Sequence, residues 1–253
     1  NKVNRALQRA RDTKSLIIGR GVVRRSAEMF LELFAGCKAV IVADENTWQV
    51  AGADVKESLD SSGIVSEQPY VFPARDFYAH WQHIESLKSY LESKDAIAIA
   101  VGSGVINDTV KLVSHMIGRR YMCVGTAASM DGFTAYGASI TKDGNKQTFD
   151  CPAPLGFIMD SEIAAAAPKE LAASGYADLI AKIPAGADWM LADAVGSEKI
   201  DSFAWELVQD GLKDALSDPA AVFAGDVSMT QALADGLLMS GFAMQAIQSS
   251  RPA

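Results

Sequence analysis

The chain has 253 residues, of which 49% are hydrophobic, and its 23 lysines and arginines against 31 aspartates and glutamates give a formal net charge of -8. This length and apolar content suffice to bury a sizeable core, in one large domain or two modest ones. The negative charge, with no basic cluster to offset it locally, argues against nucleic acid as a partner and favours small-molecule ligands.

The cysteines and the first residues indicate in which cellular compartment the protein is expected to work. Cys37, Cys123 and Cys151 are widely spaced in apolar surroundings, which predicts buried thiols rather than a disulfide framework or a zinc knuckle. The first residues are charged without an apolar leader, and no later segment reaches the length of a membrane span. We therefore expect a reducing, cytoplasmic setting and no membrane partner. Because the chain begins with Asn1 and not Met, we also expect that it is trimmed at its start.

Over the first 160 residues, short apolar segments alternate with amphipathic helical patterns. Such alternation argues for a largely parallel sheet covered by helices. Helical patterns run from about Val23, after Asn46, through Leu87 and after Gly104, and Lys111 falls outside the apolar face of the last of these. The predicted strands are SLIIG at 15–19, KAVIVAD at 38–44, PYVF at 69–72, AIAIAVG at 96–102 and YMCVG at 121–125.

A hairpin and a last strand follow. The segment SITKDGNKQTF at 139–149 predicts a hairpin, because Asp143 and Gly144 suit a type I′ turn between alternating residues. The segment GFIMD at 156–160 predicts the last strand, and Ser161 is expected to cap the helix that follows.

Beyond residue 160 the sequence is rich in alanine and predicts helices without strands. The clearest helical segments are 201–216 and 229–247, and the second is apolar nearly all round, which implies burial. Pro184 and Gly186 are expected to kink or break the helix that begins near Ala173.

Gly102, Ser103 and Gly104 lie between a predicted buried strand and a predicted helix. A helix start offers unpaired N–H groups and a positive dipole end, and two glycines let an anion approach the backbone closely, which suits a pyrophosphate. The third glycine of the common dinucleotide fingerprint is absent. From these residues alone, a plain tight turn is supported about equally well.

Further polar residues follow predicted strands, at the edge where open α/β sheets bind ligands. Asp44 closes one strand, where its carboxylate could accept hydrogen bonds from ribose hydroxyls or cap the next helix. Thr126, Ser129 and Asp131 follow another strand, where they could bind a polyol or a nicotinamide ribose, or only cap their own loop.

Other titratable residues favour structural interpretations. Asp178 lies four residues before Lys182, and a surface ion pair is the default interpretation of this spacing. His80 and His83 would share a helical face, but no third metal ligand is near in sequence. His115 lies late in a predicted helix, where a cation interacts favourably with the dipole.

Taken together, five segments resemble the sn-glycerol-1-phosphate dehydrogenase family, in the group that contains iron-dependent alcohol dehydrogenases, glycerol dehydrogenase and dehydroquinate synthase. The family has an N-terminal nucleotide-binding α/β domain and a C-terminal helical domain, with NAD(P) and a divalent metal between them. We therefore expect an NAD(P)-binding α/β domain with a largely parallel sheet at 1–160, and an all-helical metal and substrate domain at 161–253. The five segments are VADENTW, VGSGVINDTVK, GTAASMDGFTAYGASITKDGNKQTF, SGYADLIAK and SGFAMQAIQSSRPA.

The resemblance implies roles for the residues at the strand ends. Residues 102–104 would cradle the pyrophosphate, and Asp44 would bind the adenosine ribose. Thr126 and Ser129 would line the nicotinamide side. A carboxylate on the ribose diol would repel a 2′-phosphate, so NADH is expected to bind better than NADPH.

The family reaction is the reduction of dihydroxyacetone phosphate to sn-glycerol 1-phosphate, in which the metal polarises the ketone and nicotinamide C4 delivers hydride. By the resemblance, Asp131 would meet the substrate as the catalytic residue, and Asp178 would be the carboxylate ligand of the metal, with zinc favoured over nickel or iron. Two histidine ligands are expected beyond the SSRPA motif, where this sequence stops. We therefore expect a helical domain that is truncated at its C-terminus and a chain that, as written, is inactive and holds no tight metal.

Several alternatives remain open at this point. A glycerol or other polyol dehydrogenase of the same group is the nearest, and a catalytically silent nucleotide-binding protein is another; a lyase of the dehydroquinate synthase type fits less well. A phosphorylated triose or polyol substrate needs a basic pocket, to which Lys142 or Lys146 could contribute, although solvated hairpin lysines are the default interpretation. Homo-oligomerisation is left open.

Overall fold

A six-stranded sheet forms the centre of the first 160 residues in the computed structural model, which describes residues 2–250 and 252. Its strands are β1 (Ser15–Gly19), β2 (Ala39–Asp44), β3 (Tyr70–Phe72), β4 (Ile97–Gly102), β5 (Met122–Gly125) and β8 (Gly156–Asp160). Their order across the sheet is β1-β8-β5-β4-β2-β3, and every neighbouring pair is parallel. The predicted parallel α/β fold is confirmed.

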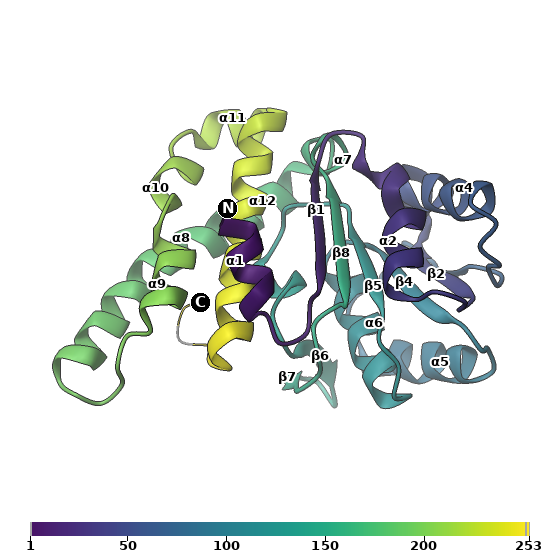
Figure 1. The fold of residues 1–253 in the computed structure, drawn as a ribbon, viewed down its shortest axis with the longest axis horizontal. Coiled ribbons are helices and arrows are strands. Elements are labelled where there is room, and N and C mark those ends of the chain that lie inside the picture. The colour runs from purple at the N-terminus through teal and green to yellow at the C-terminus, as the bar shows by residue number, and fades with distance from the viewer. Residues whose placement is uncertain (1, 251, 253) are drawn as a thin grey trace.

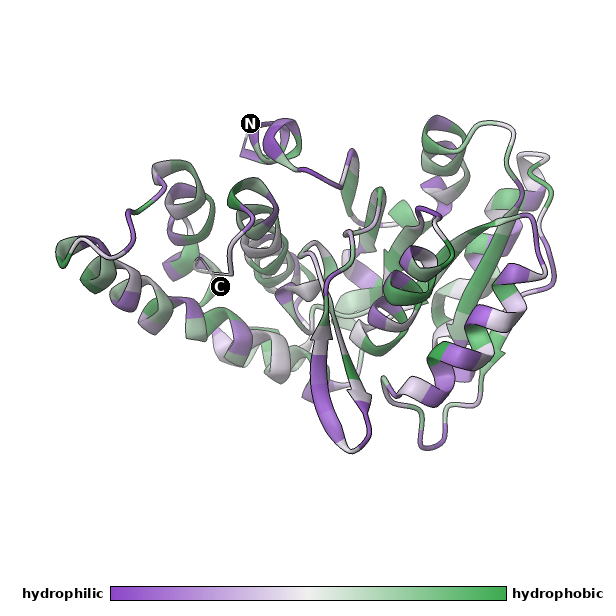
Figure 2. Ribbon diagram, turned by 90° about the horizontal axis from the view of Figure 1, so that it is seen from below, coloured by the Kyte–Doolittle hydropathy of each residue, from purple (hydrophilic) through white to green (hydrophobic). Residues whose placement is uncertain are grey.

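Helices cover both faces of this sheet (Figure 1). Because successive strand residues point to opposite faces, Ile99 and Val124 join one apolar core while Ala100 and Cys123 join the other. Figure 2 shows the hydrophobic strands between helices that carry hydrophilic residues. Helices α2 (Ser26–Leu33) and α4 (Ala53–Ser61) supply the first core, and α5 (Trp81–Glu92) and α6 (Gly104–Met116) supply the second. Short 3₁₀, α and π turns complete these connections at η1 (Val22–Arg25), α3 (Glu45–Thr47) and η2 (Trp48–Gly52).

The predicted hairpin is present as β6 (Ala138–Lys142) and β7 (Asn145–Phe149). Asp143 and Gly144 have φ values of 51° and 73°, as a type I′ turn requires. The Lys142 ammonium lies 3.7 Å from the centre of the Trp81 ring, in a cation–π contact, and Lys146 is exposed. The cation–π contact and the exposure agree with the structural and solvated interpretations of these lysines, and their contribution to a phosphate pocket stays a prediction.

Among the described residues after β8, every element of regular secondary structure is a helix. Helix α1 (Lys2–Arg9) lies against α12 (Val227–Ile247), far from it in sequence (Figure 1), and Arg5 pairs with Glu206 on α9 (Ser202–Gln209). The division into two domains at residue 160 stays a prediction, because α1, from the first part of the chain, packs against the helices of the second part. The helices after β8 are α7 (Ser161–Ala165), α8 (Lys169–Ala194), α9 (Ser202–Gln209), α10 (Leu212–Ala215), α11 (Pro219–Ala224) and α12 (Val227–Ile247).

Two expectations about the helical part need correction. Helix α8 continues through Pro184 and Gly186 as one element, so a break there is wrong, whereas a kink stays a prediction. Proline removes a single N–H donor, and packing of α8 against α9, α11 and α12 holds the helix together around this loss. The helix predicted over 201–216 is instead two helices, because Gly211 adopts a left-handed conformation with φ of 85° between them.

Three local assignments are also wrong. Asp160, not Ser161, caps α7, because its carboxylate accepts a hydrogen bond from the Glu162 N–H at 3.1 Å. His80 caps α5 from outside the helix, so it does not share a helical face with His83. Cys37 is exposed, whereas the other two cysteines are buried as expected.

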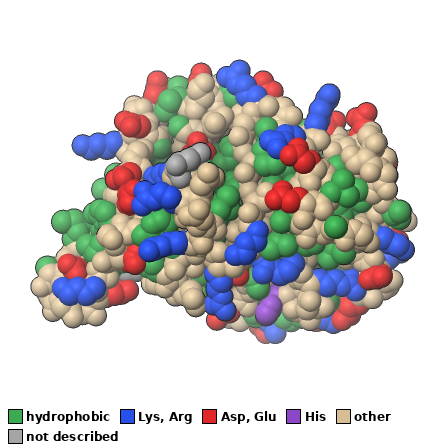
Figure 3. All heavy atoms as spheres, viewed as in Figure 1, with side chains coloured by type: hydrophobic (Ala, Val, Ile, Leu, Met, Phe, Trp, Pro, Cys, Tyr) green, Lys and Arg blue, Asp and Glu red, His purple; other side chains and the backbone are tan. Residues whose placement is uncertain are grey.

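The surface carries charged side chains of both signs. Acidic and basic side chains are interspersed on the face shown in Figure 3. Among residues 2–250, no helix combines the length and the apolar character that a bilayer span needs.

Candidate active site

A groove of about 560 Å³ lies at the carboxyl ends of the parallel strands. Asp44 at the end of β2, Ser103 after β4 and Thr126 after β5 all line it. The start of α7 and the turn into α8 contribute a largely apolar opposite wall, which includes Ile163 and Leu171. The structure therefore brings together three of the predicted cofactor residues, at the edge where open α/β sheets bind ligands.

Asp44 caps the helix after β2 with one of its two carboxylate oxygens. Oδ1 accepts hydrogen bonds from the N–H groups of Asn46 and Thr47, each at 2.9 Å, and the Thr47 hydroxyl accepts one from the Asp44 N–H at 3.0 Å. Within the described residues, Oδ2 makes no hydrogen bond. The capping interpretation is thus correct, and it leaves the second oxygen for a ligand.

The first turn of α6 lacks a side-chain cap. Ser103 occupies the N-cap position, but its hydroxyl accepts no hydrogen bond from the helix. The first N–H groups of this 13-residue helix therefore have no side-chain partner. They lie beside the groove, together with the positive end of the helix dipole.

Packing also bears on both glycines of this loop, more firmly on Gly102, which meets the branched base of a side chain, than on Gly104, which meets the end of a flexible one. A Cβ atom at Gly102 would lie 2.7 Å from Ile106, and one at Gly104 would lie 2.8 Å from the Met130 sulfur. These contacts can account for the glycines even if no ligand binds here. The glycines also leave the loop without side chains that would shield the start of the helix.

A second group of polar residues lies where the loop after β5 meets α8 and α12. The loop contains η3 (Asp131–Phe133). Lys182 on α8 lies 2.7 Å from Asp131 Oδ2 and 3.0 Å from Asp178 Oδ1. The Asp131 N–H donates to Asp178 Oδ2 at 2.7 Å, and the Ser240 hydroxyl on α12 donates to Asp131 Oδ2 at 2.9 Å. The two carboxylates that were expected to serve substrate and metal are thus neighbours.

Burial controls the electrostatics of this cluster. The Lys182 side chain is only 3% exposed, so the pair with Asp178 is not the surface pair that its spacing suggested. Burial raises the pKa of the Asp131 carboxyl above its usual value, against the opposing pull of Lys182. For Lys182 itself, burial favours the neutral amine, but Asp131 and Asp178 outweigh that effect and raise its pKa. Two carboxylates therefore share one ammonium.

Two glycines let α8 and α12 reach this loop at backbone distance. A Cβ atom at Gly175 would lie 2.0 Å from the Ala128 carbonyl oxygen. One at Gly241 would lie 2.2 Å from the Thr134 hydroxyl and 2.7 Å from the carbonyl oxygen of Asp131. No larger residue fits at either contact without moving the backbone, so these glycines set the position of Asp131 relative to both helices.

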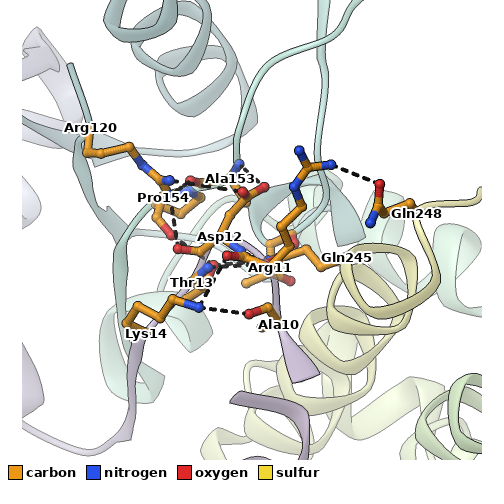
Figure 4. A network of polar contacts seen from close by, with 11 residues as sticks. Ala10, Arg11, Asp12, Thr13, Lys14, Arg120, Ala153, Pro154, Gln245 and Gln248 are labelled. Carbon is orange, nitrogen blue, oxygen red and sulfur yellow. Dashed lines mark hydrogen bonds and ion pairs between the residues drawn. The ribbon is translucent and has the colours of Figure 1, made fainter. Parts of the chain in front are cut away.

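Gln245 ties the same region to the sheet (Figure 4). Its Oε1 accepts hydrogen bonds from the N–H groups of Asp12 and Thr13, at 3.0 and 3.2 Å. Its Nε2 donates to the Thr13 hydroxyl at 3.0 Å and to the Thr134 carbonyl. The segment before β1, the loop after η3 and α12 are therefore joined by one buried side chain.

Comparison with known proteins agrees with this architecture. The profile of a family described as iron-containing alcohol dehydrogenase matches residues 17–168, which is more than half of the chain. The chain belongs to the iron-containing alcohol dehydrogenase family. Its membership confirms the resemblance inferred from the five sequence segments.

Within this family, named relatives are glycerol-1-phosphate dehydrogenases [NAD(P)+]. The protein of that name from Bacillus velezensis is 31% identical over 218 residues, which are 85% of this chain and 55% of the relative. The one from Pyrococcus furiosus is 29% identical over 245 residues, which are 95% of this chain and 68% of the relative. The chain thus spans about half the length of the Bacillus relative.

A solved structure of the same fold is glycerol dehydrogenase from Schizosaccharomyces pombe. It superposes with a TM-score of 0.74 at 20% identity, over 92% of this chain and 61% of that one. This likeness shows the fold: a parallel α/β sheet followed by helices.

The arrangement of donors in the described residues does not fit the metal that the family name implies. Residues 2–250 and 252 contain no group of three His, Cys, Asp or Glu side chains placed to hold an ion. Both oxygens of Asp178 are already engaged, by Lys182 and by the Asp131 N–H. His83 packs against the rings of Phe72 and Phe77, and burial lowers its pKa.

Ser129 does not reach the groove. It is buried in the loop between Thr126 and Asp131 and is absent from the groove lining. Its predicted contact with the nicotinamide side stays a prediction.

Sequence reasoning missed two buried lysines. The helical spacing of Lys182 and Asp178 predicts a surface pair, whereas the Lys182 side chain is 3% exposed. Lys111 was placed outside the apolar face of α6, yet it is 1% exposed, and its ammonium donates to the carbonyls of Gly132, Ala135 and Gly137 at 2.8, 2.9 and 3.0 Å. The polar residues that surround Lys111 on α6 are also buried, because the η3 loop and the hairpin cover that side of the helix. The sequence offers one signal for this burial: α6 carries several polar residues although apolar segments precede and follow it, so those polar residues can be covered by other parts of the chain.

Proposed function

We propose that this chain provides the NAD(P)-binding groove and the substrate carboxylate of an oxidoreductase that reduces dihydroxyacetone phosphate to sn-glycerol 1-phosphate. The observation that carries this proposal is the meeting of Asp44, Ser103 and Thr126 in one groove beside an uncapped helix start. The printed names of the relatives, glycerol-1-phosphate dehydrogenase [NAD(P)+], support the choice of cofactor and substrate.

The groove suits a dinucleotide for three reasons. The free N–H groups at the start of α6 would bind the pyrophosphate, and the bare glycine backbone at 102–104 would let it approach. The free Oδ2 of Asp44 would accept hydrogen bonds from the adenosine ribose, and its charge would disfavour a 2′-phosphate. Thr126 would contact the nicotinamide side. When bound, the reduced nicotinamide would supply the hydride.

Asp131 would orient the substrate. Lys182 and Ser240 both bind its Oδ2, which leaves Oδ1 without a hydrogen-bond partner among the described residues. An oriented carboxylate with one free oxygen can accept a hydrogen bond from a substrate hydroxyl. Asp178 is the residue that the resemblance assigns to the metal; in the described residues it stabilises the Asp131 loop.

A second candidate is a nucleotide-binding protein without oxidoreductase activity. The engagement of Asp178 favours it, because both oxygens of the carboxylate that the resemblance assigns to the metal already have partners, Lys182 and the Asp131 N–H. Oxidation of NADH by dihydroxyacetone phosphate, assayed with the natural full-length protein, would separate the two candidates, since both include the groove but only the first includes turnover.

The groove is tested by titrating the protein with NADH and with NADPH and following nicotinamide fluorescence. Asp44→Asn keeps the helix cap, because asparagine caps as well as aspartate, and it removes the charge. We expect this variant to bind NADH roughly ten- to hundredfold more weakly, since a hydrogen bond to a charged group contributes about 1.5–3 kcal/mol, while NADPH binding changes little or improves.

The matched control is Asp95→Asn, which removes an exposed aspartate just before β4, at the opposite edge of the same sheet. It should leave both affinities unchanged. Failure of the unmodified protein to bind either nucleotide would refute the proposed groove, and equal losses for both nucleotides in Asp44→Asn would remove Asp44 from the ribose site.

A further inference from the structure

Lys182 occupies the space between two carboxylates that come from different elements. Its ammonium lies 2.7 Å from Asp131 Oδ2 and 3.0 Å from Asp178 Oδ1, and its side chain is 3% exposed. The helix backbone at this residue is held as well, since Gln209 donates from its side-chain amide to the Lys182 carbonyl at 3.1 Å. The ammonium is thus a fixed part of the cluster and not a mobile surface charge.

Other lysines with the same helical spacing behave differently. Lys56 pairs with Asp60 at i, i+4 on α4, where the two side chains are 32% and 52% exposed. That lysine contacts a single carboxylate in water, and such pairs contribute little. Lys182 is distinguished by a second carboxylate, Asp131, which the loop after β5 brings from a distant part of the sequence.

We propose that Lys182 is the built-in cation of this site and that it competes with a divalent metal ion for the carboxylates of Asp131 and Asp178. The inference rests on the proposed function only in treating Asp178 as the family's metal position. A metal ion bound to Asp178 would lie about 2 Å from a carboxylate oxygen that Lys182 now contacts, so the two like charges would repel each other at short range.

The two carboxylates have supports that do not depend on the lysine. Asp178 Oδ2 accepts a hydrogen bond from the Asp131 N–H, and Asp131 Oδ2 accepts one from the Ser240 hydroxyl. Replacing the ammonium with an uncharged side chain of similar length would therefore leave two oriented carboxylates side by side without a cation. Such a pair of oxygen ligands favours a hard divalent ion such as Mn²⁺.

The experiment measures Mn²⁺ binding to the purified protein by electron paramagnetic resonance of the free ion. Lys182→Met should bind Mn²⁺ at least tenfold more tightly than the unmodified protein. Lys182→Arg, which keeps the charge, should bind no more tightly than the unmodified protein. Asp178→Asn added to Lys182→Met should remove the gain. Lys56→Met, which breaks an exposed pair of the same spacing, should have no effect.

Equal Mn²⁺ affinity in the unmodified protein and in Lys182→Met would overturn the proposal, and so would a gain of the same size in Lys182→Arg. Lys182→Gln serves as a second uncharged variant if Lys182→Met loses its circular dichroism spectrum, and the same tenfold gain is expected of it. NADH titration of the same samples separates this inference from the proposed function. A Mn²⁺ gain without NADH binding refutes the dinucleotide groove alone, and NADH binding without a Mn²⁺ gain refutes the role of Lys182 alone.

Discussion

Asp235 should make the protein less stable as the pH rises from about 4 to 6. This residue lies on α12 and lines a mostly apolar groove of about 300 Å³ together with residues of α1 and α10, among them Lys2. Burial raises the pKa of Asp235 to about 6, and Lys2 offsets the effect only in part. In the unfolded chain the pKa of an aspartate is about 3.9.

The sign and size follow from proton linkage. Between these two pKa values the folded protein holds the Asp235 proton while the unfolded chain has lost it, so the free energy of unfolding falls as the pH rises. About two pKa units at roughly 1.4 kcal/mol each give a loss of up to about 3 kcal/mol at pH 7. The loss is absent below about pH 4, where both states are protonated.

The perturbation is Asp235→Asn, which removes the charge and keeps the shape. Urea unfolding followed by circular dichroism at pH 4, 5, 6 and 7 should show the variant more stable by roughly 2–3 kcal/mol at pH 7, with the difference fading towards pH 4. Asp95→Asn, on an exposed residue, is the control and should show no such trend. A stability difference of the same size at pH 4 and at pH 7 would refute the reasoning, as would a variant that is less stable at pH 7.

Three further variants test the contacts that build the candidate site, each by urea unfolding. Gly175→Ala should cost roughly 3 kcal/mol, because its Cβ would lie 2.0 Å from a backbone carbonyl, whereas Ser174→Ala on the exposed side of α8 should be neutral; equal effects would contradict the close approach. Lys111→Met should cost about 3–5 kcal/mol by leaving three buried carbonyls and a buried aspartate without their cation, and a loss under about 1 kcal/mol would show that water replaces it. Ser240→Ala should cost about 1.5–3 kcal/mol through its lost hydrogen bond to Asp131, and an unchanged midpoint would exclude that bond.

Much of the fold could be predicted from local patterns in the sequence. The strands follow from short β-branched apolar segments, and the hairpin follows from Asp143 and Gly144, since such features act on neighbouring residues and need no distant partner. Asp44, Ser103 and Thr126 could be singled out because each follows a predicted strand, and the carboxyl ends of parallel strands lie at one edge. That edge is where the groove lies.

The roles of the charged residues inside the site were decided by tertiary structure. Helical spacing made Lys182 the partner of Asp178, but only the loop that carries Asp131 buries the pair, and Ser240 completes it from 109 residues beyond Asp131. In the sequence, Gly175 is only a residue of low helix propensity. The tertiary structure shows that the Ala128 carbonyl lies against it and leaves no room for a side chain. A local pattern records which residues share a face of an element, whereas burial of a charge depends on which distant groups cover that face and satisfy its hydrogen bonds.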